Sequence, residues 1–454
     1  MESPPQNINI YLSLNVYPKN KTNNYIFIIC SIYVIIIIII VIVIYIKEII
    51  MNFLPVILGT DVNSYSMARS FHMKYGIKSL VLGKAKLLMT ENSDIVDIII
   101  NKDLDDDAVM LDELNKIKEA HQNKELILVA SSDSYAERVI MNKDKIRGYN
   151  LPFTDKSMLN ELILKKNFYD LCEKYGLKYP KSEYINKDNY KSYKTSFDFP
   201  MVLKPSNSVE YFFLDFEGKK KAYILKNEAE LNKALNDIYA NGYDDYMIAQ
   251  EFIEGADSNM HVVNAYVDSN GKLKLFSLGR ALMEDPTPLL IGNYLAIADA
   301  SQDAYEKIFP MIKNFLEKIN YRGLANFDIK LDDRTKEYKV FEINLRQGRS
   351  SFFSTLAGAN LAEALVNDFV YHKDDEIIIG KDKFLFLGAR YETVLKYIES
   401  DAAKEKMSSY NDDIESMALY YRKDLNAKRK ASLDEYYSRY DKRFEEFFKK
   451  KLVN

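Results

Sequence analysis

The sequence predicts an α/β and α+β protein in which a doubly wound parallel sheet is followed by antiparallel strands and a helical tail. Strand and helix patterns alternate from residue 53 to about residue 150, which is typical of βαβ units. Longer apolar strands follow residue 247, and the last two of them form a hairpin. With 454 residues, the chain is long enough for several domains and a large buried core.

The first domain begins with an apolar strand over Phe53–Leu58, the turn Gly59–Asp61 and a helix over Ser64–Tyr75 that Gly76 ends. Further strands are predicted over Ser79–Gly83, Ile95–Ile100 and Leu126–Ala130, with a helix over Asp112–Lys124. No GxGxxG follows the first strand, so a dinucleotide site is not expected. The turn lies where open α/β sheets bind ligands, although helix capping explains it equally well.

The middle of the chain begins with a short helix over Ile163–Tyr175, ended by Gly176 and Pro180. After it we expect strands over Met201–Lys204, Tyr223–Leu225, Met247–Phe252, His261–Val267 and Lys272–Leu278, and a helix over Glu228–Tyr239. From about Asp382 the chain is rich in Lys, Glu and Tyr, which predicts a mostly helical tail.

Composition excludes several classes of protein. The 62 Lys and Arg residues nearly balance the 66 Asp and Glu residues, so no global electrostatic footprint for nucleic acid exists. Two cysteines and four histidines exclude a disulfide scaffold and a Cys/His zinc cluster. We therefore expect a protein of a reducing compartment, the cytoplasm, without a nucleic-acid partner.

The hairpin carries the sharpest chemical pattern. Its two strands read NFDIK and VFEINLR, and side chains along a strand alternate between two faces. If Lys330 pairs with Val340, Asp328 lies directly opposite Glu342, with Cβ atoms about 5 Å apart. Two carboxylates at this distance repel each other unless a cation lies between them.

Asn344 and Arg346 share the face of Glu342. Asp, Glu and Asn side chains offer oxygen ligands only, which suit Mg²⁺ and not zinc. Asp328, Glu342 and Asn344 are therefore candidate magnesium ligands. The alternative is an ordinary hairpin whose acids pair with Lys330 and Arg346.

Two weaker elements precede the hairpin. Lys204 ends an apolar strand just before the loop Ser206–Ser208, from which a lysine can reach a phosphate as a point charge. The run Met247–Gly255 joins a buried strand to a polar hinge whose backbone groups can bind an adenine edge. Taken alone, each element is also typical of an ordinary strand end.

In this order and spacing, the three elements resemble the ATP-grasp superfamily of carboxylate–amine ligases, over about residues 53 to 371. Within this superfamily, four stretches of the sequence resemble the family of D-aspartate ligases: Leu58–Asn63, Met67–His72, Phe168–Pro180 and Asn344–Ser351. The resemblance implies an ATP-grasp architecture: a doubly wound parallel-sheet domain over 51–150, a small α+β lid over 151–246, a larger antiparallel-sheet catalytic domain over 247–380, and a helical C-terminal extension over 381–454.

Carried over to this sequence, the family's site comprises three sets of residues. The implied nucleotide-binding set is Lys165 (with Lys166 as a near-equal alternative), Lys204, Ser206, Ser208, Gln250, Glu251, Ile253 and Asp257. The implied metal ligands are Asp328, Glu342 and Asn344. Arg346 is implied to face the transferring phosphoryl group, and Arg280 is the candidate for stabilising the tetrahedral intermediate. Ser206 and Ser208 replace the glycine-rich loop of many members, because no glycine lies between Lys204 and Gly218.

The resemblance implies that a carboxylate is activated as an acylphosphate and joined to an amine, giving ADP and phosphate. D-Aspartate and the lysine side chain of a peptidoglycan precursor are the implied substrates, and ATP and two Mg²⁺ ions, for which Mn²⁺ can substitute, are the implied cofactors. No protein nucleophile is needed, which fits the lack of a Ser–His–Asp or Cys–His pattern. Two alternatives stay open: a ligase for another amino acid and amine, such as a dipeptide-forming one, and a nucleotide-binding module without turnover.

Residues 1–50 do not fit this picture. Tyr25–Ile46 is an apolar run of 22 residues, which as a helix spans about 33 Å and can cross a bilayer. Its flanking charges favour a cytoplasmic N-terminus, which places the ATP-using body outside the cell. Lys47–Glu48 can be encoded as a ribosome-binding sequence, with Ile49–Ile50 as the spacer. We therefore expect translation to begin at Met51, with a membrane anchor as the alternative.

Overall fold

The structure is a computed structural model that describes residues 52–287, 290 and 292–453, together with Ile32, Val34 and Ile36. The chain divides into two compact units, Met1–Asn52 and Phe53–Asn454. The expectations for residues 1–50, an anchor or an untranslated leader, lie outside the described residues, apart from these three helical positions. Among the helices that the structure describes, none combines the length and the apolar character that a membrane crossing requires.

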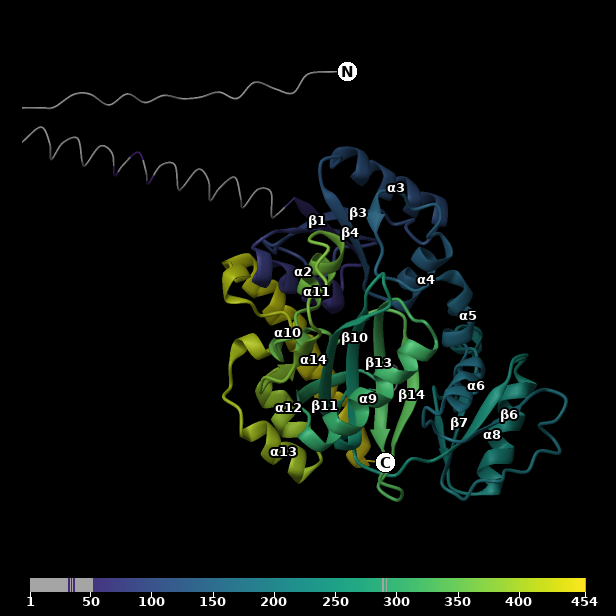
Figure 1. Cartoon of the computed structure of the whole chain (residues 1–454). Coiled ribbons are helices and arrows are strands. Elements are labelled where there is room, and N and C mark those ends of the chain that lie inside the picture. The colour runs from purple at the N-terminus through teal and green to yellow at the C-terminus, as the bar shows by residue number, and fades with distance from the viewer. Residues whose placement is uncertain are drawn as a thin grey trace, which may run out of the picture. The chain divides into compact units, whose positions relative to one another are not determined.

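The larger unit begins with a parallel sheet of five strands in the order β3-β2-β1-β4-β5. Its strands are β1 (Phe53–Leu58), β2 (Ser79–Gly83), β3 (Val96–Ile100), β4 (Glu125–Ala130) and β5 (Tyr149–Asn150), and its helices are α2 (Val62–Tyr75), α3 (Asp107–Ala120) and α4 (Asp133–Met141). Figure 1 shows these elements at the top of the view.

The predicted parallel sheet is confirmed, and the predicted bounds of its first two strands match β1 and β2. Gly76 ends α2 with φ of 69°, the left-handed conformation that favours glycine. The prediction for α3 was wrong by five residues at its start, because Asp106 accepts hydrogen bonds from the backbone of Ala108 and Val109 and so caps the helix earlier. Helix α4 was not predicted.

A second sheet of four strands has the order β6-β9-β7-β8. Its strands are β6 (Ser182–Ile185), β7 (Met201–Pro205), β8 (Tyr223–Leu225) and β9 (Met247–Glu251), and the helices of this region are α5 (Lys156–Ile163), α6 (Lys165–Tyr175), α7 (Ser208–Phe213) and α8 (Glu228–Ala240). The single helix predicted over Ile163–Tyr175 is instead the second of two, because Leu164 is extended between them. Strand β9, which opens the predicted catalytic domain, is hydrogen-bonded to β6 and β7 of this small sheet.

The third sheet has seven strands, in the order β14-β13-β10-β11-β12-β16, with β15 paired to β11. Its strands are β10 (Met260–Val267), β11 (Leu273–Glu284), β12 (Tyr294–Asp299), β13 (Gly323–Leu331), β14 (Tyr338–Asn344), β15 (Ile378–Gly380) and β16 (Leu385–Leu387); a 3-10 helix, η1 (Asp257–Asn259), precedes β10. Helix α9 (Gln302–Lys318) follows β12, and α10 (Phe352–Leu356) and α11 (Leu361–Phe369) follow the hairpin. Strand β12 and helix α9 were not predicted.

The seven-stranded sheet separates two hydrophobic cores. On one face, Phe327 and Ile329 of β13 pack with apolar side chains of α9, such as Phe315; Figure 1 shows α9 lying across this sheet. On the other face, Val262 packs in a core that includes α2, α10, α11 and the C-terminal segment. Residues of the parallel sheet contribute to both cores, such as Leu58 to the first and Ile57 to the second.

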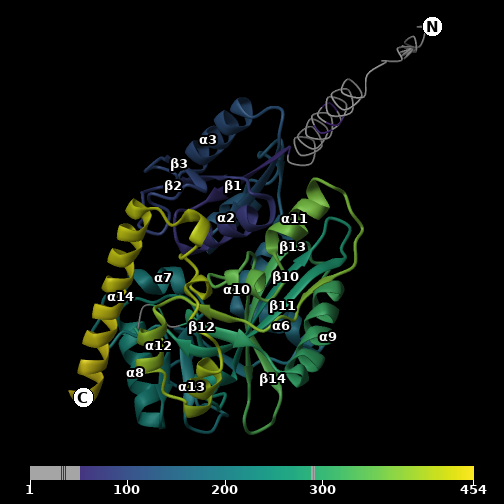
Figure 2. The same ribbon diagram turned by 90° about the vertical axis from the view of Figure 1, so that its left-hand side faces the viewer.

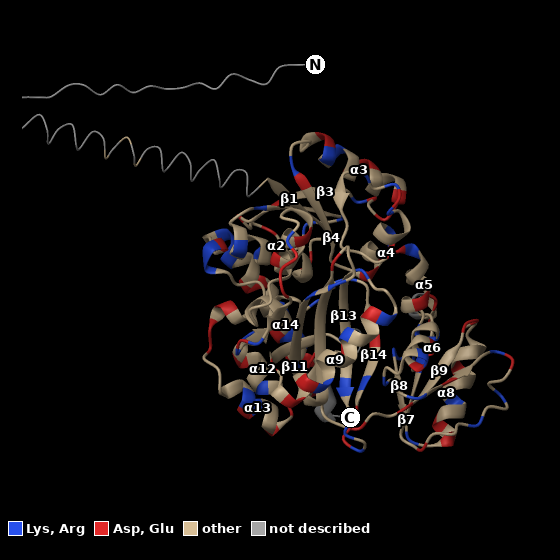
Figure 3. Cartoon of the chain, in the orientation of Figure 1, with Lys and Arg blue, Asp and Glu red and all other residues tan. Residues whose placement is uncertain are grey.

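The C-terminal extension is less purely helical than its composition predicts. Strand β16 pairs with β12, so the extension begins inside the seven-stranded sheet. It continues as α12 (Tyr391–Tyr397), α13 (Asp401–Ser408), the 3-10 helices η2 (Ile414–Ser416) and η3 (Arg422–Asp424), and α14 (Ala427–Val453). Figure 2 shows these elements in yellow, with α14 as one long helix. Basic and acidic residues both occur along surface helices such as α3 and α8 (Figure 3).

Arg69 fastens the extension to α2. Its side chain is fully buried, and its guanidinium lies 4.0 Å from the ring centre of Phe352. It donates hydrogen bonds to the backbone carbonyls of Met417 at 2.8 Å and Glu415 at 3.1 Å. Arg69 belongs to the stretch Met67–His72 that carries part of the family resemblance, and in the structure its contacts are with the protein interior.

We expect Arg69→Met to lower the free energy of unfolding by about 3 kcal/mol, because buried carbonyls lose a charged donor. Urea unfolding followed by circular dichroism measures this loss. Lys74→Met on the same helix is the control: Lys74 forms an exposed ion pair with Glu363, which contributes less than about 1 kcal/mol. Equal effects of the two substitutions would contradict the assignment.

Candidate active site

The β13–β14 hairpin brings two acidic side chains together. Asp328 is directly paired with Glu342, as predicted. The predicted register beyond this pair was wrong: Val340 lies opposite Ile329, and not opposite Lys330, because a bulge follows the Asp328 pair. The bulge places one extra residue on β14 and leaves Glu342 facing Asp328.

The two carboxyl groups are close enough to share a hydrogen bond. Burial and the neighbouring Glu342 raise the pKa of Asp328 well above its usual range. Burial works against ionisation of Glu342 too, but the positive charges of Lys165, Lys204 and Lys221 outweigh it and lower its pKa. The pair thus offers closely spaced carboxyl oxygens, which are the kind of ligand that a divalent cation such as Mg²⁺ prefers.

Asn344 completes the predicted metal set. Its Nδ2 donates to Oδ1 of Asn326 at 2.9 Å, and Asn326 Nδ2 donates in turn to the carbonyl of Val263 at 2.9 Å. This chain orients the amide of Asn344 so that its oxygen is left for another partner. Among the described residues, no group of three or more His, Cys, Asp or Glu side chains is arranged so that it could hold a metal ion.

The alternative of an ordinary hairpin does not describe this site. Arg346 donates to the carboxylate of Asp133, 2.8 Å away, and Lys330 lies over the ring of Phe252. Neither cation is the ion-pair partner of Glu342, which instead lies 3.7 Å from Lys165 Nζ.

A cavity of about 200 Å³ adjoins the acidic pair. Four of the predicted site residues line this cavity: Asp328, Glu342, Asn344 and Arg346. Val62 and Asp133, which follow β1 and β4, line it from the carboxyl edge of the parallel sheet. The expected ligand-binding edge of the first domain therefore contributes to the site, while Asp61 itself caps α2 by accepting from the backbone of Asn63 and Ser64.

A second cavity lies beside Glu342 and Asn344, and Lys165, Ser206 and Lys221 line it. Lys166, the alternative to Lys165, points elsewhere: it forms a 2.8 Å ion pair with Asp170 and lies over the ring of Tyr184. The structure thus brings Lys165, and not Lys166, to the acidic pair.

Gln250 holds Lys204 in place. Lys204 Nζ donates to Gln250 Oε1 at 3.0 Å, and Gln250 Nε2 donates to Ser182 and to the hydroxyl of Tyr169. Burial, reinforced by the charge of Lys165, lowers the pKa of Lys204 to about 7. The side chain of Gln250 therefore positions a lysine, and its backbone lies in β9 between Ser182 of β6 and Val202 of β7.

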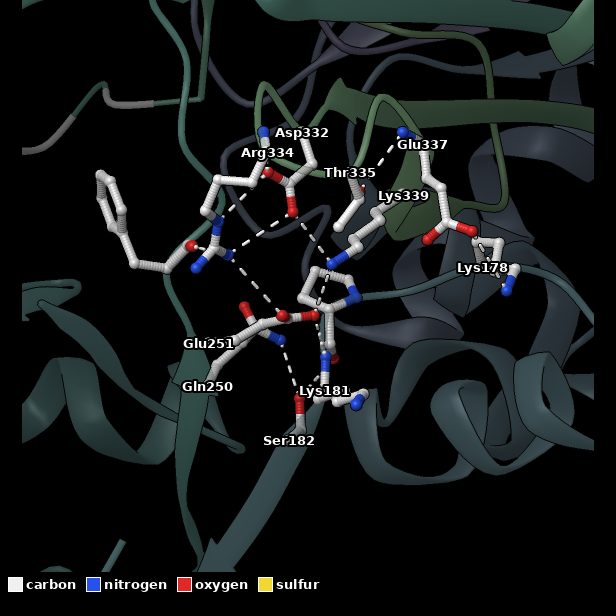
Figure 4. Close-up of polar contacts among 12 residues, drawn as sticks. Lys178, Lys181, Ser182, Gln250, Glu251, Asp332, Arg334, Thr335, Glu337 and Lys339 are labelled. Carbon is white, nitrogen blue, oxygen red and sulfur yellow. Dashed lines mark hydrogen bonds and ion pairs between the residues drawn. The ribbon is translucent and has the colours of Figure 1, made fainter. Parts of the chain in front are cut away.

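Glu251 belongs to a buried ionic network, shown in Figure 4, that connects the small sheet to the hairpin. Its carboxylate accepts from Lys339 Nζ at 2.7 Å and from the backbone of Lys181 at 2.8 Å. Lys339 also donates to the fully buried Asp332, which Arg334 contacts from the other side. The side chain of Glu251 thus fixes the hinge strand β9 against the hairpin.

The remaining predicted nucleotide ligands are placed as follows. Ile253 is buried, and Asp257 is exposed at the start of η1. Ser208 is the first residue of α7, and its side chain lies outside what the structure describes.

Arg280 is not brought to this group. It pairs with His261, which pairs with Ile329, so all three side chains lie on the α9 face of the sheet. Asp328 pairs with Val262 and lies on the opposite face. The Arg280 side chain donates to the carbonyl of Ser258 at 2.7 Å. The predicted role of Arg280 was therefore wrong, because strand alternation directs it away from the acidic pair.

Many residues that line the first cavity were not predicted, among them Lys221, Arg349, Tyr436 and Tyr440. Arg349 lies in the stretch Asn344–Ser351 that carries the family resemblance, and this stretch was the available signal. The two tyrosines lie on α14, about 100 residues after the hairpin, and no local pattern connects them to it.

We expect Lys339→Met to lower the free energy of unfolding by about 3 kcal/mol near neutral pH, because Asp332 and Glu251 lose their shared cation. Burial opposes ionisation of Asp332, but the backbone of Arg334 and the Lys339 ammonium outweigh it and lower its pKa. A lowered carboxyl pKa adds stability above about pH 4, and this contribution disappears as the pH falls through the folded-state pKa. The difference between wild type and variant is therefore expected to shrink below about pH 4, in urea titrations at several pH values.

The matched control is Lys178→Met. Lys178 forms an exposed ion pair with Glu337 near the same hairpin and is expected to contribute less than about 1 kcal/mol. A Lys339→Met effect that is as small as this, or that does not depend on pH, would refute the network's role.

Comparison with known proteins identifies the family. No protein-family model matches the chain. It is 40% identical over 410 residues to the D-aspartate ligase of Enterococcus faecium strain Aus0004, an alignment that covers 87% of this chain and 97% of that protein.

Solved structures confirm the fold. N5-carboxyaminoimidazole synthetase from Staphylococcus aureus, complexed with ADP, has a TM-score of 0.56 at 15% identity, over 76% of this chain and 84% of that one. L-amino acid ligase from Bacillus licheniformis has a TM-score of 0.51 at 14% identity, over 70% of this chain and 74% of that one. These likenesses bear out the ATP-grasp fold. Because the chain covers nearly the whole of a relative that is 40% identical to it, it belongs to the D-aspartate ligase family of ATP-grasp ligases.

Proposed function

We propose that this protein uses Mg-ATP to join D-aspartate to the amine of the lysine side chain in a peptidoglycan precursor. The 40% sequence identity to the Enterococcus faecium D-aspartate ligase, over 97% of that protein, supports the choice of these two substrates. The observation that carries the chemistry is the pair Asp328 and Glu342 beside a cavity, with three lysines around it. Since ATP and such precursors are made in the cytoplasm, we propose a cytoplasmic location for the body of the chain.

The residues around the cavities fit the binding of Mg²⁺ and the phosphates of ATP. Asp328, Glu342 and Asn344 would hold Mg²⁺, which when bound neutralises charge on the phosphates. Lys165 and Lys204 would contact those phosphates as point charges, and Ser206 and Ser208 would donate to them in place of glycine-rich backbone. An acylphosphate forms when the substrate carboxylate attacks the γ-phosphorus and ADP leaves, and positioning and charge neutralisation supply most of the rate.

Arg346 would stabilise the transferring phosphoryl group. It lines the first cavity with the acidic pair, and its ion pair with Asp133 restricts its position. The adenine would bind the backbone of Gln250, Glu251 and Ile253, and Asp257 would reach the ribose. We also propose functional domains over 51–150, 151–246, 247–380 and 381–454, with β9 hydrogen-bonded into the sheet of the second domain and β16 into that of the third. When the amine attacks the acylphosphate, it loses a proton and phosphate leaves, so the amide forms without a protein nucleophile.

Phosphate release tests this function. Purified protein with ATP, Mg²⁺, D-aspartate and a lysine-containing precursor is expected to release one phosphate for each amide formed. Release with L-aspartate and not with D-aspartate would overturn the substrate, and release with another amino acid and amine would favour a dipeptide-type ligase. Nucleotide binding without release for any pair would favour a non-catalytic module.

Glu342→Gln is expected to lower kcat by about 1,000-fold or more, because one charge of the metal site is lost. Its thermal midpoint is expected to stay near that of wild type, since Glu342 is 41% exposed toward the cavity. The assay measures phosphate release over a Mg²⁺ titration, with Glu337→Gln, at an exposed position just before β14, as the control. Near-wild-type kcat in Glu342→Gln would remove the metal assignment.

The adjacent lysines of α6 form a matched pair for a second test. Lys165→Met is expected to raise the KM for ATP about 10- to 100-fold, because a charged contact to phosphate is lost. Lys166→Met removes the same charge one residue away, where it pairs with Asp170, and is expected to change this KM less than about threefold. The opposite ranking in steady-state assays would assign the nucleotide contact to Lys166.

A further inference from the structure

Arg349 is a cation at the wall of the first cavity that the proposed chemistry does not use. It lies in the loop after β14 and lines the same cavity as Asp328, Glu342 and Arg346. Across the described part of the chain, its guanidinium has no hydrogen-bond or ion-pair partner. Five N–H donors of one side chain are thus left for a molecule in the cavity.

The acids nearest to Arg349 are already bound to other groups. Asp61 caps α2, where it accepts from the backbone of Asn63 and Ser64. Asp285 accepts from Arg443 at 2.7 Å and from the hydroxyl of Thr287 at 2.6 Å. Burial disfavours the charged form of Arg349. The nearby Asp61, Asp285 and two tyrosines of α14 nevertheless raise its pKa above the usual value, so the guanidinium is charged. The charge is therefore present but unmatched by a direct contact.

The C-terminal helix α14 encloses this end of the cavity. Tyr436 and Tyr440 line the cavity from α14, and Arg443 lies 4.0 Å from the ring centre of Tyr440. Because Arg443 is held by Asp285, the ring of Tyr440 is fixed in turn. The cavity has about 200 Å³, which suits a small metabolite and not a large one.

We propose that Arg349 binds the second carboxylate of the amino-acid substrate, the one that is not converted to an acylphosphate. The acidic pair and Arg346 mark the end of the cavity where one carboxylate reacts, and Arg349 supplies a planar fork for a second carboxylate. The site thereby selects an amino acid with two carboxylates over one with a single carboxylate. This inference rests on the proposed function and deepens it by assigning a specificity-determining residue.

The test compares D-aspartate with its two analogues that carry one carboxylate, D-alanine and β-alanine. One of them keeps the carboxylate that reacts, and we expect it to be a slow substrate of the wild-type protein. Arg349→Gln is expected to lower kcat/KM for D-aspartate about 10- to 100-fold through KM, because a charged hydrogen-bonded pair is lost. For the slow analogue, kcat/KM is expected to change less than about threefold, since that molecule lacks the group that Arg349 binds.

Three outcomes would overturn the inference. They are an equal loss for D-aspartate and the analogue, an increase confined to the KM for ATP, and an unchanged KM for D-aspartate. Arg439→Gln is the control, because Arg439 is exposed on α14 and pairs with Glu435. If Arg349→Gln does not fold, Arg349→Lys keeps the charge without the fork and is expected to give a smaller increase of the same KM. A wild-type protein that does not use D-aspartate would refute the proposed function instead, so the two failures are distinguishable.

Discussion

The placement of two carboxylates opposite each other, Asp328 and Glu342, is the constraint on which the rest of the site depends. Strand pairing fixes their separation, and burial makes their mutual repulsion strong, so the surrounding structure must supply positive charge. Lys165, Lys204 and Lys221 supply it from three different segments, and Asn344 supplies an amide that Asn326 orients. In the proposed function, a divalent cation would give these closely spaced oxygens a partner other than one another.

The same geometry explains why three sheets are needed. The seven-stranded sheet carries the acids, the four-stranded sheet carries Lys204 with Gln250 behind it, and the parallel sheet sends Asp133 to Arg346. Each junction is made by ionic or hydrogen-bonded side chains, of which Asp133 is exposed and the others named here are largely withdrawn from water. Glu251, Lys339 and Asp332 join the small sheet to the hairpin, and Arg69 joins α2 to the C-terminal segment. Such contacts are specific in direction, so they determine how the sheets face one another as well as how strongly they adhere.

Features that depend on residues close together in the sequence were predicted better than features that depend on contacts between distant segments. Strands β1 and β2, the glycine cap at Gly76 and the Asp328–Glu342 pair follow from local periodicity, and the structure confirms them. Helix α9 and strand β12 were missed, and the break at Leu164 was read as one continuous helix. The predicted role of Arg280 was inferred from its residue type alone, without knowledge of which face of β11 its side chain lies on. Alternation along β11, combined with its pairing to His261, places it on the face that α9 covers.

The sequence by itself determined the parallel sheet of the first domain, the oxygen-rich face of the hairpin and the family to which the chain belongs. Those features depend on side-chain alternation and on residues near each other along the chain. Only the tertiary structure decided that Lys165 and not Lys166 approaches the acids, that Gln250 supports Lys204, and that Arg349 and two tyrosines of α14 border the same cavity. These contacts join residues that are distant in sequence, and their formation depends on how separate sheets and helices pack, which no local pattern of charge or hydrophobicity specifies.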